Sequence, residues 1–392
     1  MKLTREQLLA DLHQAYFDAR RHKRNKPYQL LFESRLEKNL EELCDELLTR
    51  SYHPGRSTCF LINDPKRREV FAAQFRDRIV HHLYYNYTHH FLERTFIYDT
   101  YSCIKHRGTH FGINRLEHHI RQESLNWNQQ CYVLKMDIRG YFMHINRDKL
   151  LDITIRQLRR MVRRWGEVDL SFIEYLTKEI IMLNPVTDCI IHGDKAKWEE
   201  LPKEKSLFYS KEGCGLPIGN LTSQLFSNVY LNELDQFMKR ELHCCHHGRY
   251  VDDFYVVSAD RAWLHSIIPR VKTFLIEELS LTLHEGKTQI RNVRLGVEFL
   301  GAYLKPYRRY VSNTSLKRTR KKWASIEHEK EPVQLRARIN SFLGILSHYK
   351  SKRIQLKALS VLSTPYEYGY YVGNKNGFIY KLRTQTSELI KN

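Results

Sequence analysis

Long apolar runs and paired cysteines are both missing from this chain of 392 residues. No apolar run reaches the roughly 18 residues that mark a membrane-spanning helix, so no membrane partner is expected. The eight cysteines include no pair in CxxC spacing, and the N-terminus is a charged, helix-like segment rather than a secretory signal. These absences favour a cytoplasmic protein whose thiols stay reduced.

Acidic residues are scarce relative to basic ones. Lys and Arg number 64 against 44 Asp and Glu, which gives a net charge of +20 with neutral His. Residues 305–392 hold 19 Lys and Arg, five Glu and no Asp, a net charge of +14. This surplus indicates a polyanionic partner such as nucleic acid; a basic, solvated surface is the alternative. With 42% hydrophobic residues, the chain can still bury a large core.

Several segments have the periodicity of regular structure. Leucines at every third or fourth position predict a helix within residues 30–50. Short strands are predicted at residues 59–62 and 69–72, followed by a helix over 75–92. A further helix near the C-terminus has one apolar face, formed by Leu335, Ile339, Phe342, Leu343 and Leu346.

Two adjacent carboxylates, Asp252 and Asp253, stand between two runs of strand-forming residues. Arg249–Val251 is predicted as one strand and Phe254–Val257 as its partner, which places both aspartates at the tip of a tight hairpin. Ionised carboxylates side by side repel each other, and a cation that prefers oxygen ligands, such as Mg²⁺, would neutralise them. An Asp-rich turn without a function is the alternative, because Asp is common in turns.

A third carboxylate, Asp137, ends an apolar strand predicted over residues 131–137. Gly140 then permits a sharp turn. Across a sheet, Asp137 would face the hairpin tip, which is the arrangement of a two-metal phosphoryl-transfer centre. Between these elements lies a loop, Gly215–Gln224, whose Gly and Pro residues precede a helix predicted over Leu225–Leu234.

The order of these elements resembles that of the reverse transcriptases. A strand ending in Asp137 is followed by LPIGNLTSQ, YVDD, HEGKT and VEFLG, over roughly residues 50–310. Five elements in order are more specific than any one of them. The resemblance implies an α+β right-hand polymerase. Its expected parts are N-terminal helices and fingers (1–130), a palm with an antiparallel sheet (131–305), a fingers insertion (about 150–212) and a basic helical thumb with a C-terminal tail (306–392).

The resemblance also implies chemistry for individual residues. Asp137, Asp252 and Asp253 would be catalytic and, with the carbonyl of Ile138, would hold two Mg²⁺ ions. Contacts to the dNTP are expected from Lys66, Arg68, Phe142, Gly219 and Lys287, with the ring of Phe142 excluding a ribose 2′-hydroxyl. Contacts to the template and to the RNA/DNA duplex are expected from Arg107, Lys317, Arg318, Arg320 and Lys321. The structural alternatives are a basic surface turn for Lys66 and Arg68, a core aromatic for Phe142 and a surface lysine for Lys287.

Two positions indicate which subgroup of reverse transcriptases the chain resembles. Ile218 stands where most relatives have Gln, and Gln224 where most have Pro. The IGNLTSQ loop resembles the reverse transcriptases of diversity-generating retroelements and of bacterial clades tied to antiphage defence. Ile218 cannot offer polar contacts to the nascent base pair, which predicts error-prone copying; packing beneath the loop is the alternative. The long basic tail favours the defence-associated enzymes, which implies cDNA synthesis from a dedicated noncoding RNA.

Other functions remain open at this point. A template-independent or protein-primed nucleotidyl transferase would use the same metal chemistry. An inactive nucleic-acid-binding scaffold is disfavoured because all three carboxylates are present. No Asp follows Asp260, so a fused RNase H domain with its own carboxylate cluster is not expected. An accessory protein or a second copy of the chain is a further possible partner.

Overall fold

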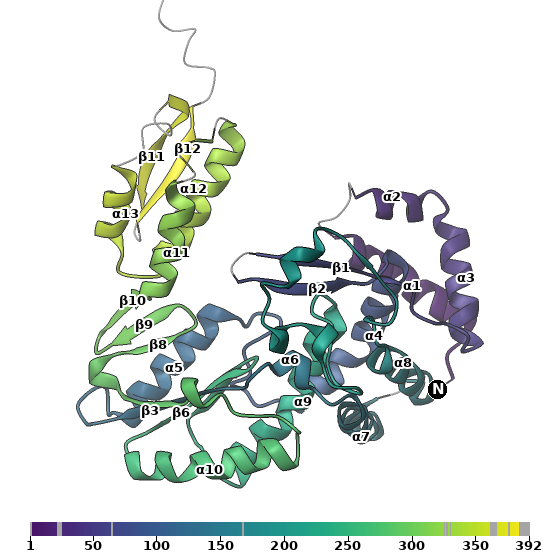
Figure 1. Ribbon diagram of the computed structural model, residues 1–392, viewed down its shortest axis with the longest axis horizontal. Helices are drawn as coiled ribbons and strands as arrows, with labels where there is room; N and C mark the ends of the chain where they lie inside the picture. Colours follow the sequence, from purple (N-terminus) through teal and green to yellow (C-terminus); the bar gives the residue numbers. More distant parts are fainter. Residues whose placement is uncertain are drawn as a thin grey trace, which may run out of the picture. The chain divides into compact units, whose positions relative to one another are not determined.

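The computed structural model describes residues 2–21, 26–63, 66–166, 168–324, 326, 328–329, 331–360, 367–374 and 377–383. The chain forms two compact units. Unit 1 consists of Met1–Gly112, Lys135–Val256 and Ala262–Gln289, and unit 2 consists of Ile113–Leu134, Val257–Arg261 and Ile290–Asn392. Helices and antiparallel hairpins occur in both units, as expected for an α+β protein (Figure 1).

Helices make up most of unit 1. The helix predicted within residues 30–50 is two helices, α2 (Pro27–Glu33) and α3 (Leu36–Leu48), because the backbone of Arg35 is not helical (φ −138°, ψ 42°). Leu40, Leu43 and Leu47 of α3 are buried, as the periodicity predicts, and Leu36 is half-buried. The other helices that lie wholly or mostly in this unit are α1 (Arg5–Arg20), α4 (Phe75–Glu93), α6 (Tyr141–His144), α7 (Arg147–Trp165), α8 (Leu170–Met182), α9 (Leu221–Arg240) and α10 (Arg261–Glu277).

A three-stranded sheet in the order β2-β1-β4 forms the predicted fingers hairpin and its neighbour. Strands β1 (Ser57–Ile62) and β2 (Arg68–Ala72) are antiparallel, which confirms the two predicted strands. Strand β4 (Cys189–Ile191) runs parallel to β1. It belongs to the predicted insertion, which also contains α7, α8 and the short helices η1 (Lys195–Trp198), η2 (Lys203–Lys205) and η3 (Leu207–Tyr209). The insertion is therefore part of the fingers sheet.

A four-stranded sheet in the order β5-β6-β3-β7 carries the predicted carboxylates. Its strands are β3 (Tyr132–Asp137), β5 (His247–Tyr250), β6 (Asp253–Ser258) and β7 (Gln289–Asn292), with η4 (Glu285–Lys287) just before β7. Helix α9 buries most of its length, and α4, α7 and α8 pack beside it or one another (Figure 1).

Unit 2 contains α5 (Thr109–Glu123), which begins in unit 1, and a sheet in the order β10-β9-β8. Its remaining elements are η5 (Val293–Leu295), β8 (Val297–Phe299), β9 (Ala302–Lys305), β10 (Arg308–Val311), α11 (Asn313–Ala324), α12 (Pro332–Ser347), α13 (Lys352–Leu359), β11 (Gly369–Asn374) and β12 (Gly377–Leu382). The predicted apolar face of α12 is buried against Trp323 and Tyr380. The part predicted as a helical thumb thus also contains the β11–β12 hairpin. Within the described residues, no helix has the length and apolarity needed to span a bilayer.

Candidate active site

The hairpin predicted to carry two catalytic aspartates has a two-residue turn. Tyr250 pairs with Asp253, so Val251 and Asp252 form the turn and Asp253 is the first residue of β6. Val251 has φ +55°, a left-handed conformation that is unfavourable for a β-branched residue. The expectation that both aspartates lie at the tip is therefore wrong by one residue: Asp252 is in the turn and Asp253 is in the strand.

Asp137 is the last residue of β3, the strand beside β6 in the sheet. The segment before η4 fixes its backbone, because His284 N donates to the carbonyl oxygen of Asp137 at 2.8 Å. The same segment brings Lys287 to the carboxylate, with Nζ 2.8 Å from Oδ1. Lys287 is thus not an isolated surface lysine, since its ammonium group contacts a predicted catalytic carboxylate.

The carboxylates influence one another electrostatically. Burial, reinforced by the nearby negative charge of Asp137, raises the pKa of Asp252 to about 6. Burial likewise raises the pKa of Asp253 to about 6, against the opposing effect of Lys135, whose Nζ lies 3.7 Å from Asp253 Oδ1. The three carboxylates therefore share a partly desolvated region in which a bound cation would relieve their repulsion.

The donor atoms of this region suit a metal ion, although their arrangement is not that of a preformed site. Among the residues that the structure describes, no group of three or more His, Cys, Asp or Glu side chains is arranged as a preformed metal site. The ammonium groups of Lys287 and Lys135 lie beside two of the carboxylates instead. The donor types nevertheless suit Mg²⁺, which prefers carboxylate and carbonyl oxygens. The metal ligands Asp137, Ile138, Asp252 and Asp253 stay a prediction.

The loop before α9 lies against the fingers hairpin. Phe71 N donates to the carbonyl of Ile218 at 2.9 Å. Gly219 has φ +127°, and a Cβ there would lie 2.7 Å from Val70 Cγ1 and 3.0 Å from Phe71 O, so only glycine fits. Ile218 is half-buried in this contact, which agrees with the packing alternative. Gln224 is exposed in the first turn of α9.

Phe142 and Ile218 pack against the same apolar cluster, whose buried members are Cys59, Phe71, Met143 and Leu207. Phe142 is half-buried. Tyr141, by contrast, is 2% exposed, and its hydroxyl donates to the carbonyl of Ser227 at 2.6 Å. Of these two neighbouring aromatics, Phe142 is therefore the one with a face free to border a nucleotide.

The basic residues predicted near the fingers differ in their contacts within the protein. Arg67 is paired with Glu200. Lys66 and Arg68 are exposed, and neither has an ion pair among the described residues. Arg107, predicted to contact the template, donates from Nη1 to the carbonyls of Tyr98 (2.9 Å) and Thr100 (3.0 Å). Its guanidinium therefore holds its own loop, and a template contact stays a prediction.

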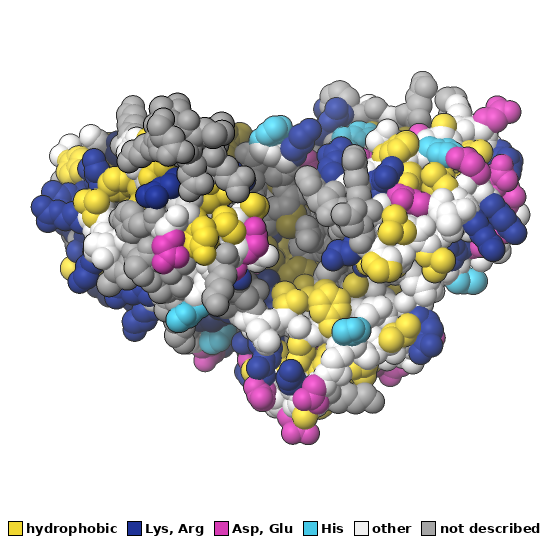
Figure 2. All heavy atoms as spheres, turned by 90° about the horizontal axis from the view of Figure 1, so that it is seen from above, with side chains coloured by type: hydrophobic (Ala, Val, Ile, Leu, Met, Phe, Trp, Pro, Cys, Tyr) yellow, Lys and Arg dark blue, Asp and Glu magenta, His cyan; other side chains and the backbone are white. Residues whose placement is uncertain are grey.

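In unit 2, Lys317, Arg318 and Arg320 are exposed on α11; they are called the α11 cations below. The side chain of Lys321 lies outside the described residues. Figure 2 shows many Lys and Arg side chains on the surface of the part that holds the C-terminal helices. The predicted thumb thus presents positive charge to solvent, as contact with nucleic-acid phosphates requires.

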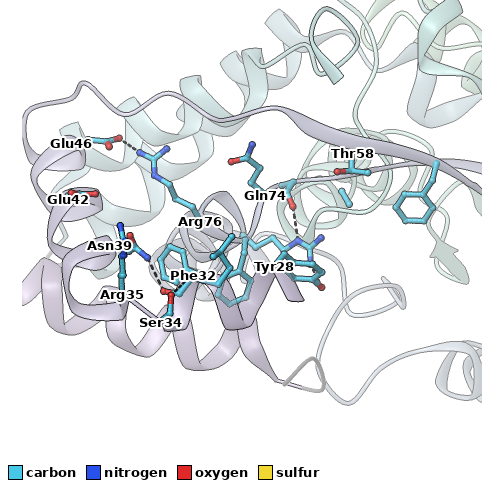
Figure 3. Close-up of a pocket in the computed structure, with 16 residues that line it drawn as sticks. Tyr28, Phe32, Ser34, Arg35, Asn39, Glu42, Glu46, Thr58, Gln74 and Arg76 are labelled. Atoms are coloured by element: carbon cyan, nitrogen blue, oxygen red, sulfur yellow. Dashed lines mark hydrogen bonds and ion pairs between the residues drawn. The ribbon is translucent and has the colours of Figure 1, made fainter. Parts of the chain in front are cut away.

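A cavity of about 920 Å³ opens between α2, α3, the β1–β2 hairpin and the start of α4 (Figure 3). No predicted site residue lines it. Arg78 Nη1 donates to Tyr28 Oη at 3.1 Å, and its guanidinium lies 5.0 Å from the centre of that ring. Arg78 pairs with no carboxylate among the described residues, whereas Arg76 is paired with Glu46. The cavity thus combines aromatic surface with a cation that has no ion pair among the described residues, and two carboxylates, Glu42 and Glu46, also line it.

Two buried carboxylates near the site were not predicted. Asp235 of α9 and Arg249 of β5 form a fully buried ion pair, and Arg249 also donates to the carbonyl of Val251 in the turn. Glu69 of β2, 1% exposed, accepts hydrogen bonds from the insertion. The available signal was a charged residue inside an apolar helix or strand, which requires a partner when the element is buried.

A family model described as "Reverse transcriptase (RNA-dependent DNA polymerase)" matches residues 64–304. No curated protein matches the chain. Among solved structures, telomerase from Candida albicans in complex with a TWJ fragment of telomeric RNA is 11% identical, with a TM-score of 0.46, over 86% of this chain and 60% of that one. Apo telomerase from Candida tropicalis is 10% identical, with a TM-score of 0.49, over 83% and 64%. The chain thus spans less than two thirds of either telomerase chain.

Proposed function

Since the chain belongs to the reverse transcriptase family, and is thereby an RNA-directed DNA polymerase with the α+β right-hand fold, we propose that it makes cDNA from a dedicated noncoding RNA at Asp137, Asp252 and Asp253. The observation that carries the site assignment is geometric: Asp137 ends β3, and the neighbouring strand β6 begins at Asp253, directly after Asp252 in the turn. Burial and the charge of Asp137 raise the pKa of Asp252, which agrees with this closeness. Carboxylates held this close together are costly to ionise unless a cation is bound there.

The polymerisation chemistry needs positioning and charge neutralisation rather than covalent work by the protein. Two Mg²⁺ ions bound there would activate the primer 3′-hydroxyl and neutralise the triphosphate. Asp137, Asp252 and Asp253 would hold them. Lys287 keeps Asp137 oriented through its 2.8 Å contact. Lys66 and Arg68 lack ion pairs among the described residues, so their charges are available to a triphosphate.

The nucleotide pocket would be bordered by Phe142 and by the Ile218–Gly219 loop. Both pack on one apolar cluster, so the ring that faces the sugar and the loop that faces the base pair share a rigid support. Gly219 lets the loop backbone approach β2 closely. We assign exclusion of ribonucleotides to the ring of Phe142.

The template strand has a matching surface in the fingers cavity. Aromatic rings stack on unpaired bases, and an arginine that has no ion pair attracts phosphate. Tyr28 and Arg78 supply both within one contact. We place unpaired template nucleotides in this cavity, and phosphates of the RNA/DNA duplex on the α11 cations.

The central test compares the wild-type protein with Asp252→Asn/Asp253→Asn. Asn keeps the side-chain shape and removes the charge, so primer extension on an RNA template in Mg²⁺ should be lost while the circular dichroism spectrum is retained. Sequencing of copurifying nucleic acid should find one small RNA and matching cDNA with the wild type only. Extension by the double variant near the wild-type rate refutes the site. Untemplated product would favour the template-independent or protein-primed alternative.

The biological role is proposed as antiphage defence, in the cytoplasm, with an accessory protein or a second copy as a candidate partner. Ile218 favours a second candidate, the error-prone enzyme of a diversity-generating retroelement, because it offers no hydrogen bond near the base pair. Ile218→Gln should then lower misincorporation several-fold without abolishing synthesis, since one such bond is worth about 1 kcal/mol. Error spectra on a defined RNA template decide this. An unchanged or higher error rate identifies Ile218 as a packing residue.

A further inference from the structure

We propose that a buried network of Asp235, Arg249, Asn228 and Ser102 positions the Val251–Asp252 turn, and that these residues act on polymerisation through the turn rather than by touching substrate. The proposal rests on the proposed function of Asp252. It adds positioning residues that lie outside the predicted active site.

The turn is held at both backbone groups of its strained residue. Val251 has φ +55°, a conformation that costs energy for a side chain branched at Cβ. Val251 N donates to Ser102 Oγ at 3.1 Å. The carbonyl of Val251 accepts from Arg249 Nη1 at 3.1 Å. Because strain of this kind persists only where the surroundings impose it, these two bonds are the contacts that keep the turn in its observed form.

Arg249 is fixed from several directions at once. Its side chain is fully buried, and Nε and Nη2 donate to the carboxylate of Asp235 at 2.6–3.0 Å. Its backbone N donates to the carbonyl of Asp99, and its own carbonyl accepts from Tyr101 N, each at 2.9 Å. The planar guanidinium therefore has one orientation, and Nη1 is aimed at the turn.

Asn228 links this arginine to the serine. Its Oδ1 accepts from Arg249 Nη1 at 3.1 Å and from Ser102 Oγ at 3.2 Å, and its Nδ2 donates to the carbonyl of Ser102 at 2.8 Å. Asn228 and Asp235 lie seven residues apart on α9, which is about two helical turns, so they share one face. The helix that begins at the nucleotide loop thus carries both anchors of the catalytic turn.

A structural role in stability alone is the competing explanation. A buried ion pair contributes little net stability compared with an apolar pair, since desolvation offsets the attraction. Here the pair is fully satisfied: His247 Nε2 also lies 2.9 Å from Asp235 Oδ1. Although burial acts in the opposite direction, Arg249 and His247 hold the pKa of Asp235 at about 2, so the carboxylate stays ionised. An apolar pair in the same place could not orient a donor, whereas the ion pair fixes the direction in which Arg249 Nη1 points.

The test uses Ser102→Ala, which deletes one oxygen, and Arg249→Lys, which keeps a cation beside Asp235 but lacks the fork. Thr177→Val is the matched control. Thr177, on α8, also has a fully buried hydroxyl, whose Oγ1 is hydrogen-bonded to Tyr84 Oη at 2.9 Å. Single-nucleotide extension is measured at saturating primer–template across a Mg²⁺ series. Amide hydrogen exchange is followed in the hairpin peptide.

Ser102→Ala should lower kcat about fivefold, the effect of one hydrogen bond, and raise the half-saturating Mg²⁺ concentration, with primer–template Kd unchanged. Arg249→Lys should do so more strongly. Exchange of the Val251 amide should accelerate in Ser102→Ala and not in Thr177→Val. In a Val251→Gly background, glycine adopts positive φ without strain, so the penalty of Ser102→Ala should shrink to about twofold.

The proposal is overturned if the Val251 amide exchanges at the wild-type rate in Ser102→Ala. It is also overturned if kcat and primer–template Kd worsen together in proportion to lost folded protein. An equal penalty of Ser102→Ala in the wild-type and Val251→Gly backgrounds overturns it as well. Hydrogen exchange needs no polymerisation, so it decides the network even if the wild type copies no RNA. In that case the proposed function fails and the positioning of the turn is judged separately.

Discussion

Replacing Glu69 with Gln should loosen residues 198–207, which include a member of the apolar cluster beneath the proposed nucleotide pocket. The carboxylate of Glu69 is buried and accepts three hydrogen bonds from that segment. Oε2 accepts from Trp198 Nε1 (2.9 Å) and Ser206 Oγ (2.8 Å), and Oε1 accepts from Leu207 N (2.7 Å). Leu207 is itself in the apolar cluster on which Phe142 packs. Glu69 therefore ties residues 198–207 to the fingers and, through them, supports the pocket.

The size of the effect follows from the donors. Gln keeps the shape, but its NH₂ group cannot accept. If the amide oxygen faces Trp198 and Ser206, the NH₂ group meets the N–H of Leu207 and one buried donor loses its partner. The opposite orientation deprives Trp198 of its acceptor, while the Ser206 hydroxyl can rotate to accept. Leaving one buried donor unsatisfied costs about 1–3 kcal/mol, so local opening of the segment should become about 5- to 150-fold more frequent.

Hydrogen exchange of residues 198–207 measures how firmly Glu69 holds this segment. Primer extension with dNTP and rNTP measures whether the segment supports the proposed nucleotide pocket. Exchange should accelerate by the stated factor, KM for dNTP should rise several-fold, and the preference for dNTP over rNTP should fall. Glu200→Gln is the control, since Glu200 belongs to the same segment but is exposed and paired with Arg67, a pair worth at most about 1 kcal/mol. Unchanged exchange in Glu69→Gln refutes the tether. Faster exchange with unchanged selection refutes the link to the pocket.

Three further outcomes are expected. Phe142→Val should raise rNTP incorporation at least tenfold relative to dNTP, measured by single-nucleotide extension; an unchanged ratio with intact dNTP use moves the gate away from this ring. Reversing the charge of the three α11 cations should reduce the slope of log affinity against log salt for an RNA/DNA duplex by up to about 3, whereas a slope equal to the wild type means that they only face solvent. Burial lowers the pKa of His81 from its usual 6.5 to about 4, so its contribution to stability is complete above pH 6.5 and is lost as the pH falls towards 4, at most about 3 kcal/mol. His81→Gln should therefore flatten the decline in urea midpoint between pH 7.5 and pH 5, and an equal decline in both proteins contradicts this assignment.

Elements with a local signal could be predicted from the sequence. The strand ending at Asp137 and the strands around residues 60 and 70 carry apolar or β-branched runs, and each is present. The β11–β12 hairpin could have been predicted as well, because a short stretch rich in Gly and Asn, residues 373–377, stands between two aromatic runs. The exact turn could not. Whether Val251 ends a strand or enters the turn depends on Ser102 and Arg249, which are brought together only by the fold.

The insertion was predicted as part of the fingers, but the strand that it adds to the β1–β2 hairpin was not. Strand β4 has three residues, too few for a periodic pattern, and its partner β1 lies far away in the sequence. The buried pair of Asp235 and Arg249 was missed for a related reason. A charged residue in a sequence predicts exposure, and only the structure shows that both charges face the same interior.

Helix α9 connects the Ile218–Gly219 loop to the residues that hold Arg249, so the number of residues between them fixes their spacing and relative orientation. Its first turn follows Gly219, and its inner face carries Asn228 and Asp235. Inserting one residue between Asn220 and Asn228 would rotate that face by about 100° and shift it by about 1.5 Å relative to the loop, which would disturb the contacts of Asn228 and Asp235 with Arg249. Insertions and deletions should therefore be absent from α9 in functional variants, while substitutions on its exposed positions are tolerated.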